Sequence, residues 1–166
     1  MKIVYLGLGS NLGDRAAYLQ SAVDELKARD LRLRRVSSLY ETEPVGLREQ
    51  GWFLNQVAEF ETELFPLQLL QRIQRIERKL GRRRILVDGP RTIDIDILLY
   101  GNAIVKAAGL EIPHPRYRER RFVLEPLAEL NPALKDPETR KTVTAMLDAV
   151  RGQVVRKTKP QSQGPQ

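Results

Sequence analysis

The feature that most restricts how this chain can fold is an alternation of isoleucine and aspartate between Thr92 and Tyr100. Successive side chains of a β-strand point to opposite faces of a sheet, so this segment reads as a strand with one apolar face and one polar face. The isoleucines would face a core. Asp94 and Asp96 would project together from the other face, roughly 6.5–7 Å apart along the strand. The chain is therefore expected to contain a sheet that packs on one side and displays two carboxylates on the other.

Hydrophobic periodicity places the other elements around this strand. Further strands are predicted over residues 2–8, 31–40 and 53–61, and helices over residues 15–29, 66–80, 121–130 and 143–150. Gly7, Gly9 and Gly13 are expected to form a turn before the first helix. The order βαββαβ indicates an α+β fold, a ferredoxin-like sandwich with helices packed on a mainly antiparallel sheet and extra C-terminal helices. We expect residues 1–156 to form a single domain that carries any catalytic site, and residues 157–166 to be a disordered tail.

Composition narrows the classes of function. The chain has no cysteine, which excludes disulfides, thiolate catalysis and cysteine-ligated zinc. Its net charge of +7 favours polyanionic partners such as nucleic acid, a membrane surface or nucleotide phosphates. Most of the basic residues are arginine, which suits bidentate contacts with phosphate. No segment is long enough to span a bilayer, and the N-terminal apolar run is too short for a signal peptide, so we expect a cytoplasmic protein without a membrane partner.

The two carboxylates and the nearby basic residues suggest phosphate chemistry. An Asp-x-Asp pair can share hard cations such as Mg²⁺, although it can equally be a solvated strand face paired with surface arginines. The context favours the metal, because Arg82, Arg84 and Arg91 precede the pair and carboxylates beside guanidiniums are what phosphoryl transfer needs. The glycines near the N-terminus do not match a dinucleotide fingerprint, and no P-loop sequence occurs. His114, held between two prolines, suggests a positioned donor.

A second unusual carboxylate lies in the predicted helix 66–80. Glu77 falls within the apolar stripe of that helix, where a carboxylate is costly unless it is paired or hydrogen-bonded.

Six motifs, in order and with near-family spacing, give the chain a resemblance to a known family. They are Gly9–Asp14, Ser38–Gly46, Phe53–Asn55, Arg75–Glu77, Gly89–Asp96 and Ile112–Arg116. From Tyr5 to about Leu130 the chain resembles the 6-hydroxymethyl-7,8-dihydropterin pyrophosphokinases of folate biosynthesis. The resemblance implies transfer of the β,γ-diphosphate of ATP to the hydroxymethyl group of the pterin, with release of AMP.

The resemblance also implies roles for particular residues. Two Mg²⁺ ions would be bound by Asp94 and Asp96. The catalytic residues would be Arg82, Arg91, Asp94 and Asp96. ATP would contact Gln74, Glu77, Arg82, Arg84, Arg91, Ile97, His114 and Arg120. The pterin would contact Thr42, Pro44, Val45, Phe53, Asn55, Asp94 and Phe122, stacked between the two phenylalanines. The expected partners are these two small molecules alone, without nucleic acid, and a monomer is expected.

Two alternatives stand beside this reading. An RNA-binding module on the same type of sheet would explain the positive charge, but it needs neighbouring aromatics on one face. Phe53 and Phe60 are separated by an odd number of residues, which places them on opposite faces. An inactive relative used for protein contacts is the other alternative. The residues that argue against it are Asp94, Asp96, Arg91 and His114, which are all retained.

Overall fold

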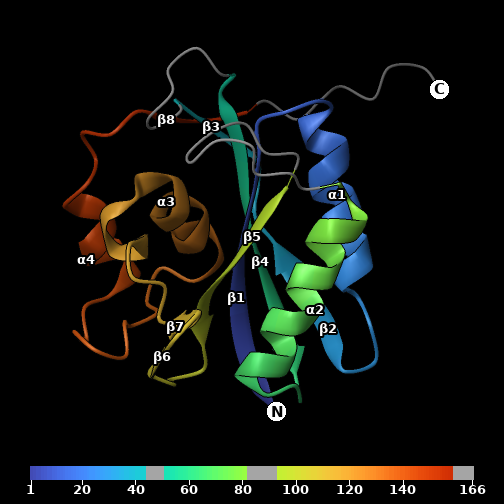
Figure 1. Ribbon diagram of the computed structural model, residues 1–166. Coiled ribbons are helices and arrows are strands. Elements are labelled where there is room, and N and C mark those ends of the chain that lie inside the picture. The colour runs from blue at the N-terminus through green and yellow to red at the C-terminus, as the bar shows by residue number, and fades with distance from the viewer. Residues whose placement is uncertain (44–50, 82–92, 159–166) are drawn as a thin grey trace.

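A computed structural model of the chain describes residues 1–43, 51–81 and 93–158. An antiparallel sheet stands between two pairs of helices, with α1 and α2 on one face and α3 and α4 on the other (Figure 1). The strand order is β5-β1-β4-β3-β8, and β2 also pairs with β4. The strands of this sheet are β1 Lys2–Ser10, β2 Leu31–Val36, β3 Tyr40–Thr42, β4 Phe53–Thr62, β5 Asp94–Tyr100 and β8 Val155–Lys157. The helices are α1 Arg15–Leu26, α2 Pro66–Lys79, the 3-10 helix η1 Tyr117–Glu119, α3 Arg121–Leu130 and α4 Val143–Asp148.

Each face of the sheet has its own core. Ile93, Ile95 and Ile97 are buried in the cluster that packs beneath α1 and α2, as the alternation predicted. Leu98 and Leu99 belong to the second cluster, beneath α3 and α4. The sheet is thus covered on both sides, and the carboxylates of β5 lie on the face of the second cluster.

Local capping explains where the helices start. The Asp14 side chain accepts a hydrogen bond from the Ala17 amide at 3.1 Å and so begins α1. In α2, Pro66 occupies the first turn, and the Gln68 side chain accepts from the Phe65 amide at 2.8 Å. Helix α3 has the predicted bounds. None of the helices in the described ranges is long and apolar enough to cross a membrane.

Helices α1, α2 and α4 end one to three residues earlier than predicted, and the structure differs from the expected elements in three further places. The predicted strand 31–40 is two strands, β2 and β3, which pair with different parts of β4. Between them, the Ser37 amide donates to the Val57 carbonyl and the Ser37 hydroxyl accepts from the Val57 amide. Gly7 and Gly9 lie inside β1 and not in a turn. A hairpin that the sequence did not predict, β6 Val105–Ala107 with β7 Leu110–Ile112, follows β5.

The C-terminal segment also differs from expectation. Residue Lys157, where the disordered tail was expected to begin, lies in β8 opposite Tyr40. The Thr158 amide then donates to the Leu39 carbonyl at 2.9 Å. The chain therefore remains hydrogen-bonded to the sheet up to Thr158, and residues 159–166 lie outside the described residues.

Candidate active site

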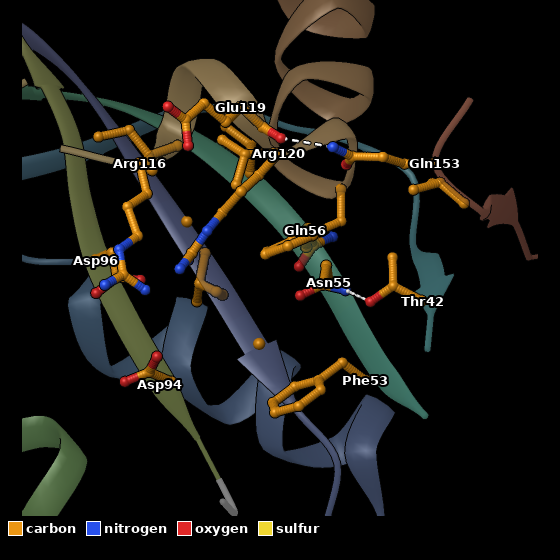
Figure 2. A pocket seen from close by; sticks show the side chains of 18 of the residues that line it. Thr42, Phe53, Asn55, Gln56, Asp94, Asp96, Arg116, Glu119, Arg120 and Gln153 are labelled. Carbon is orange, nitrogen blue, oxygen red and sulfur yellow. Dashed lines mark hydrogen bonds between the residues drawn. The ribbon is translucent and has the colours of Figure 1, made fainter. Parts of the chain in front are cut away.

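A cavity of about 670 Å³ lies on the α3 and α4 side of the sheet. Its floor is formed by β1, β4 and β5, and one wall comes from η1 and the start of α3. The other wall is the C-terminal segment that leads into β8. Figure 2 shows polar side chains around this space from β4, β5, the η1 wall and the C-terminal segment.

The floor of the cavity combines carboxylates with glycines. In the pairing of β5 with β1, Asp94 lies opposite Gly9, and Asp96 lies opposite Gly7. A Cβ atom added at Gly9 would come within 3.1 Å of Asn55 Oδ1, and one at Gly7 within 3.2 Å of Leu98 Cδ2. These glycines therefore keep the floor open beside the two carboxylates. Sequence reasoning missed this role, although the even spacing of Gly7 and Gly9 inside a β-strand was a signal for it.

A β-bulge in β5 positions His114. Leu6 pairs with Ile97 and Tyr5 pairs with Leu99, so Leu98 is an extra residue in the strand. The Leu98 carbonyl instead accepts from the His114 amide at 3.0 Å. This bond holds His114 beside Asp96, with Nε2 3.9 Å from Asp96 Oδ2.

The His114 ring is neutral at pH 7. Burial, and then the charge of Arg120, lowers the pKa of His114 to about 4. The ring accepts from the Arg116 amide through Nδ1 at 3.1 Å, so the proton lies on Nε2. The predicted positioned donor therefore has its N–H on the side of Asp96.

Guanidinium groups face the carboxylates. Figure 2 shows Arg116 and Arg120 extending from the η1 wall toward Asp96. The Arg120 guanidinium also lies 5.4 Å from the ring centre of Phe122. Arg116 was not among the predicted site residues. Its place directly after the Pro-His-Pro segment was the signal that could have found it.

The other end of the cavity is aromatic and amide-rich. Phe53, Asn55 and Thr42 lie at this end (Figure 2), and Phe122 is a further aromatic residue of the lining. Asn55 Nδ2 donates to Thr42 Oγ1 at 3.0 Å, and both side chains are buried. Phe60, by contrast, is fully buried in the opposite core, so the two phenylalanines of β4 lie on opposite faces as predicted.

Glu77 lies outside the cavity lining and supports its floor from behind. Its Oε2 accepts from the Ile95 amide at 3.0 Å, and the residue is 8% exposed. β5 is an edge strand of the sheet, so among the described residues no strand pairs with the Ile95 amide on that side. The Glu77 carboxylate, in the apolar stripe of α2, thus accepts a hydrogen bond from the backbone between Asp94 and Asp96.

The remaining predicted site residues fall into two groups. Gln74 is exposed on α2, and Ile97 is buried in the first core, so the structure does not bring these two into the cavity. Pro44, Val45, Arg82, Arg84 and Arg91 lie outside the described residues. The structure thus gathers Thr42, Phe53, Asn55, Asp94, Asp96, Arg120 and Phe122 around one cavity, with His114 beside it.

Comparison with known proteins identifies the family. Residues 5–132 match the family model described as 7,8-dihydro-6-hydroxymethylpterin-pyrophosphokinase (HPPK). The chain belongs to this family. A 2-amino-4-hydroxy-6-hydroxymethyldihydropteridine pyrophosphokinase of Bacillus subtilis is 49% identical over 129 residues, which cover 77% of each chain. The corresponding protein of Methylorubrum extorquens is 47% identical over 150 residues, covering 89% of this chain and 95% of that one.

Some relatives are much longer than this chain, and the match covers one part of them. A folic acid synthesis protein of Schizosaccharomyces pombe is 42% identical over 156 residues, covering 93% of this chain and 21% of the yeast protein. The chain therefore spans about one fifth of that relative. A crystal structure of Plasmodium falciparum HPPK-DHPS with pterin and p-hydroxybenzoate superimposes with a TM-score of 0.72 at 17% identity, covering 94% of this chain and 47% of that chain. The ferredoxin-like α+β fold is confirmed.

Proposed function

We propose that the chain transfers the β,γ-diphosphate of ATP to the hydroxymethyl group of 6-hydroxymethyl-7,8-dihydropterin, releasing AMP, as a step of folate biosynthesis. The observation that carries the proposal is the division of one cavity into a charged end and an aromatic end. Asp94 and Asp96 face guanidinium groups at one end, and Phe53 and Asn55 lie at the other. The names of the bacterial relatives support the same reaction.

The charged end suits Mg²⁺. The part of the chain that the structure describes contains no group of three or more metal-binding side chains. Mg²⁺ needs no such cage, because it commonly takes one or two carboxylates and leaves its other positions to water and substrate phosphates. Asp94 and Asp96, on one strand face and in one cavity, fit that donor set, and we propose that they hold two ions. When bound, the ions would neutralise negative charge on the phosphates.

The side chains of the cavity wall would orient the phosphates. The guanidiniums of Arg116 and Arg120 can each form paired hydrogen bonds with phosphate oxygens. His114, neutral and protonated at Nε2, can donate to an anionic oxygen without adding charge. Arg82, Arg84 and Arg91, which lie outside the described residues, remain proposed phosphate ligands on sequence grounds alone.

The aromatic end suits a flat bicyclic ring. Phe53 and Phe122 supply two ring faces, and the pterin would stack between them. Asn55 donates one N–H to Thr42, which leaves its carbonyl oxygen and second N–H for the polar edge of the ring. A few fixed donors and acceptors in an apolar slot are how such sites discriminate among small molecules.

The reaction needs positioning more than covalent chemistry. The pterin hydroxyl oxygen forms a bond with the β-phosphorus of ATP, and the bond from that phosphorus to the α,β-bridging oxygen breaks. AMP leaves with the bridging oxygen, and the hydroxyl proton is lost to water. Alignment in the cavity and the fixed positive charge of Arg116 and Arg120 would lower the barrier.

A nucleotide assay tests the proposal. The protein is incubated with ATP, Mg²⁺ and the dihydropterin, and AMP, ADP and ATP are separated by chromatography. We expect AMP only when pterin and metal are both present, and none after chelation with EDTA. Asp24→Asn, which changes an exposed carboxylate of α1, is the matched control for Asp96→Asn and should retain activity. Formation of ADP, or no turnover by the unaltered protein, would refute the proposal.

Two further expectations accompany it. We propose that the active species is a monomer. Light scattering in the presence of ATP, Mg²⁺ and the dihydropterin would measure its mass and test this. The cytoplasmic location expected from the sequence stays a prediction, to be checked by fractionation.

A further inference from the structure

The C-terminal segment Arg151–Thr158 lies beyond the residues that match the family model, yet it forms one wall of the cavity. Four of its residues line the cavity: Gly152, Gln153, Val154 and Val155. Figure 2 shows Gln153 beside Glu119 on the side of the cavity away from Asp94. The sequence predicted no site residue in this segment, and its last two residues, Lys157 and Thr158, were expected to belong to a disordered tail.

One end of this segment is fastened to the wall that carries Phe122. The Gln153 side chain donates to the Glu119 carbonyl at 2.7 Å and accepts from the Arg121 amide at 2.9 Å. The Arg121 guanidinium in turn donates to the carbonyls of Arg151 and Gln153, at 3.0 and 2.8 Å. These bonds surround the stretch of backbone that presents Arg120 and Phe122 to the cavity.

The other end is fastened to β3, which pairs with the part of the floor that carries Phe53. Residues Val155–Lys157 pair with β3, placing Val155 opposite Thr42. The Arg156 guanidinium donates to Glu41 Oε2 from two nitrogens, at 3.1 and 2.9 Å. It also lies 4.5 Å from the ring centre of Trp52, the residue before Phe53.

We propose that Arg151–Thr158 is a brace that fixes the separation between Phe122 and Phe53, and that Gln153 and Arg156 are positioning residues for the pterin. This inference rests on the proposed function, since it names what holds the proposed pterin site in shape. Gln153 and Arg156 are three residues apart, so the part of the brace between them spans at most about 10 Å. A segment this short leaves little freedom in the distance between its two ends.

The separation matters because a ring is held between two flat surfaces by short-range contacts. Each contact is favourable near 3.5–4 Å, and a gap of roughly 1 Å on one side already forfeits up to half of it. Loosening either end of the brace should therefore weaken pterin binding more than ATP binding. Asp94, Asp96 and Arg116 lie outside the braced backbone, and Arg120 is the proposed phosphate ligand that lies next to the bonds of Gln153. The expected signature is a change in the Michaelis constant for pterin without a matching change for ATP.

Steady-state kinetics provide the first test. We expect Gln153→Ala and Arg156→Ala each to raise the KM for pterin about five- to tenfold, with the KM for ATP changed less than twofold. The double variant should be little worse than either single variant, because both remove the same restraint. Gln153→Glu keeps the acceptor for the Arg121 amide but sets a carboxylate oxygen against the Glu119 carbonyl, so its effect should be at least as large as that of Gln153→Ala. Arg151→Ala is the matched control, because the Arg151 side chain bonds the exposed Asp148 and only its carbonyl binds Arg121.

Tryptophan fluorescence provides a second test that does not depend on activity. Trp52 is the single tryptophan of the chain, and it lies against Arg156. Arg156→Ala should shift the emission of Trp52 to longer wavelength because it removes the guanidinium that covers the ring. If the segment transmits restraint from one end to the other, Gln153→Ala should produce the same shift, while Arg151→Ala should not.

The outcomes separate the brace from the proposed function. Unchanged Trp52 emission in Gln153→Ala would overturn the brace whatever the enzyme does. Equal losses in the KM for pterin and for ATP would show general destabilisation and would also overturn it. Absence of AMP formation by the unaltered protein would instead refute the proposed function, and the emission of Trp52 would still decide whether the brace exists.

Discussion

Replacement of Glu77 should show that a carboxylate outside the cavity holds its floor in place. Glu77 Oε2 accepts a hydrogen bond from the Ile95 amide, and the side chain is nearly fully buried. A hydrogen bond to a charged group contributes about 1.5–3 kcal/mol to stability. A buried amide that is left without an acceptor costs about 1–3 kcal/mol. We therefore expect Glu77→Ala to lower the free energy of unfolding by about 3 kcal/mol, which for a chain of this size is a fall in melting temperature of about 6–12 °C.

The comparison with Glu77→Gln isolates the hydrogen bond. The amide oxygen of glutamine can still accept from Ile95, and a neutral bond of this kind contributes about 1 kcal/mol, so roughly half of the loss should be restored. Urea unfolding at pH 7 measures both variants, and the KM for ATP is measured on the same samples. Equal destabilisation by Ala and Gln, within about 0.5 kcal/mol, would refute the reasoning. A normal KM for ATP in Glu77→Gln would assign Glu77 to support of the strand, whereas a raised KM in a stable Gln variant would support the ATP contact expected from the family resemblance.

Three further predictions concern the floor and the fold. Asp96→Asn should lower kcat at least about a thousandfold without lowering the melting temperature, because the Asp96 side chain is 41% exposed and its role is to hold charge at the phosphates; circular dichroism and the AMP assay check this. Gly9→Ala should raise the KM for pterin about tenfold more than the KM for ATP, since its Cβ would meet Asn55 Oδ1 at 3.1 Å and displace the side chain proposed to read the ring. Burial opposes ionisation of Asp136, but bonds from Tyr117 and Arg118 lower its pKa from 3.8 to about 2. Because the pKa of Asp136 is lower in the folded state than in the unfolded state, its carboxylate stabilises the fold above about pH 4, and this stabilisation is lost as the pH falls through about 2. Asp136→Asn should therefore lower the free energy of unfolding by about 2 kcal/mol at pH 5. In urea titrations the difference from the unaltered protein should become smaller toward pH 2.

The main elements of the fold followed from local patterns. The alternation around Asp94 and Asp96 placed both carboxylates on one face because strand geometry has a period of two, and no tertiary contact is needed to establish it. The bounds of α3 were predictable because an apolar face ran without interruption between Arg121 and Leu130. In the same way, the odd spacing of Phe53 and Phe60 was enough to assign them to opposite faces.

Other features depended on contacts that local sequence does not encode. The division of the 31–40 segment into β2 and β3 follows from bonds between Ser37 and Val57, which are twenty residues apart. The role of Glu77 could be recognised only as a buried carboxylate in need of a partner, and the partner is a backbone amide of another element. The structured state of Val155–Lys157 depends on pairing with β3, more than a hundred residues earlier.

The bulge at Leu98 shows how such a non-local feature reaches the chemistry. The run Ile97-Leu98-Leu99 is apolar throughout, so its sequence gives no sign that the alternation shifts by one residue there. The shift turns Leu98 and Leu99 toward the same core and leaves the Leu98 carbonyl without a partner in β1. That carbonyl is what binds the His114 amide, and the His114 ring then lies beside Asp96. The two carboxylates and His114 are therefore recognisable from the sequence, while the placement of His114 against Asp96 depends on an irregularity that only the packed sheet reveals.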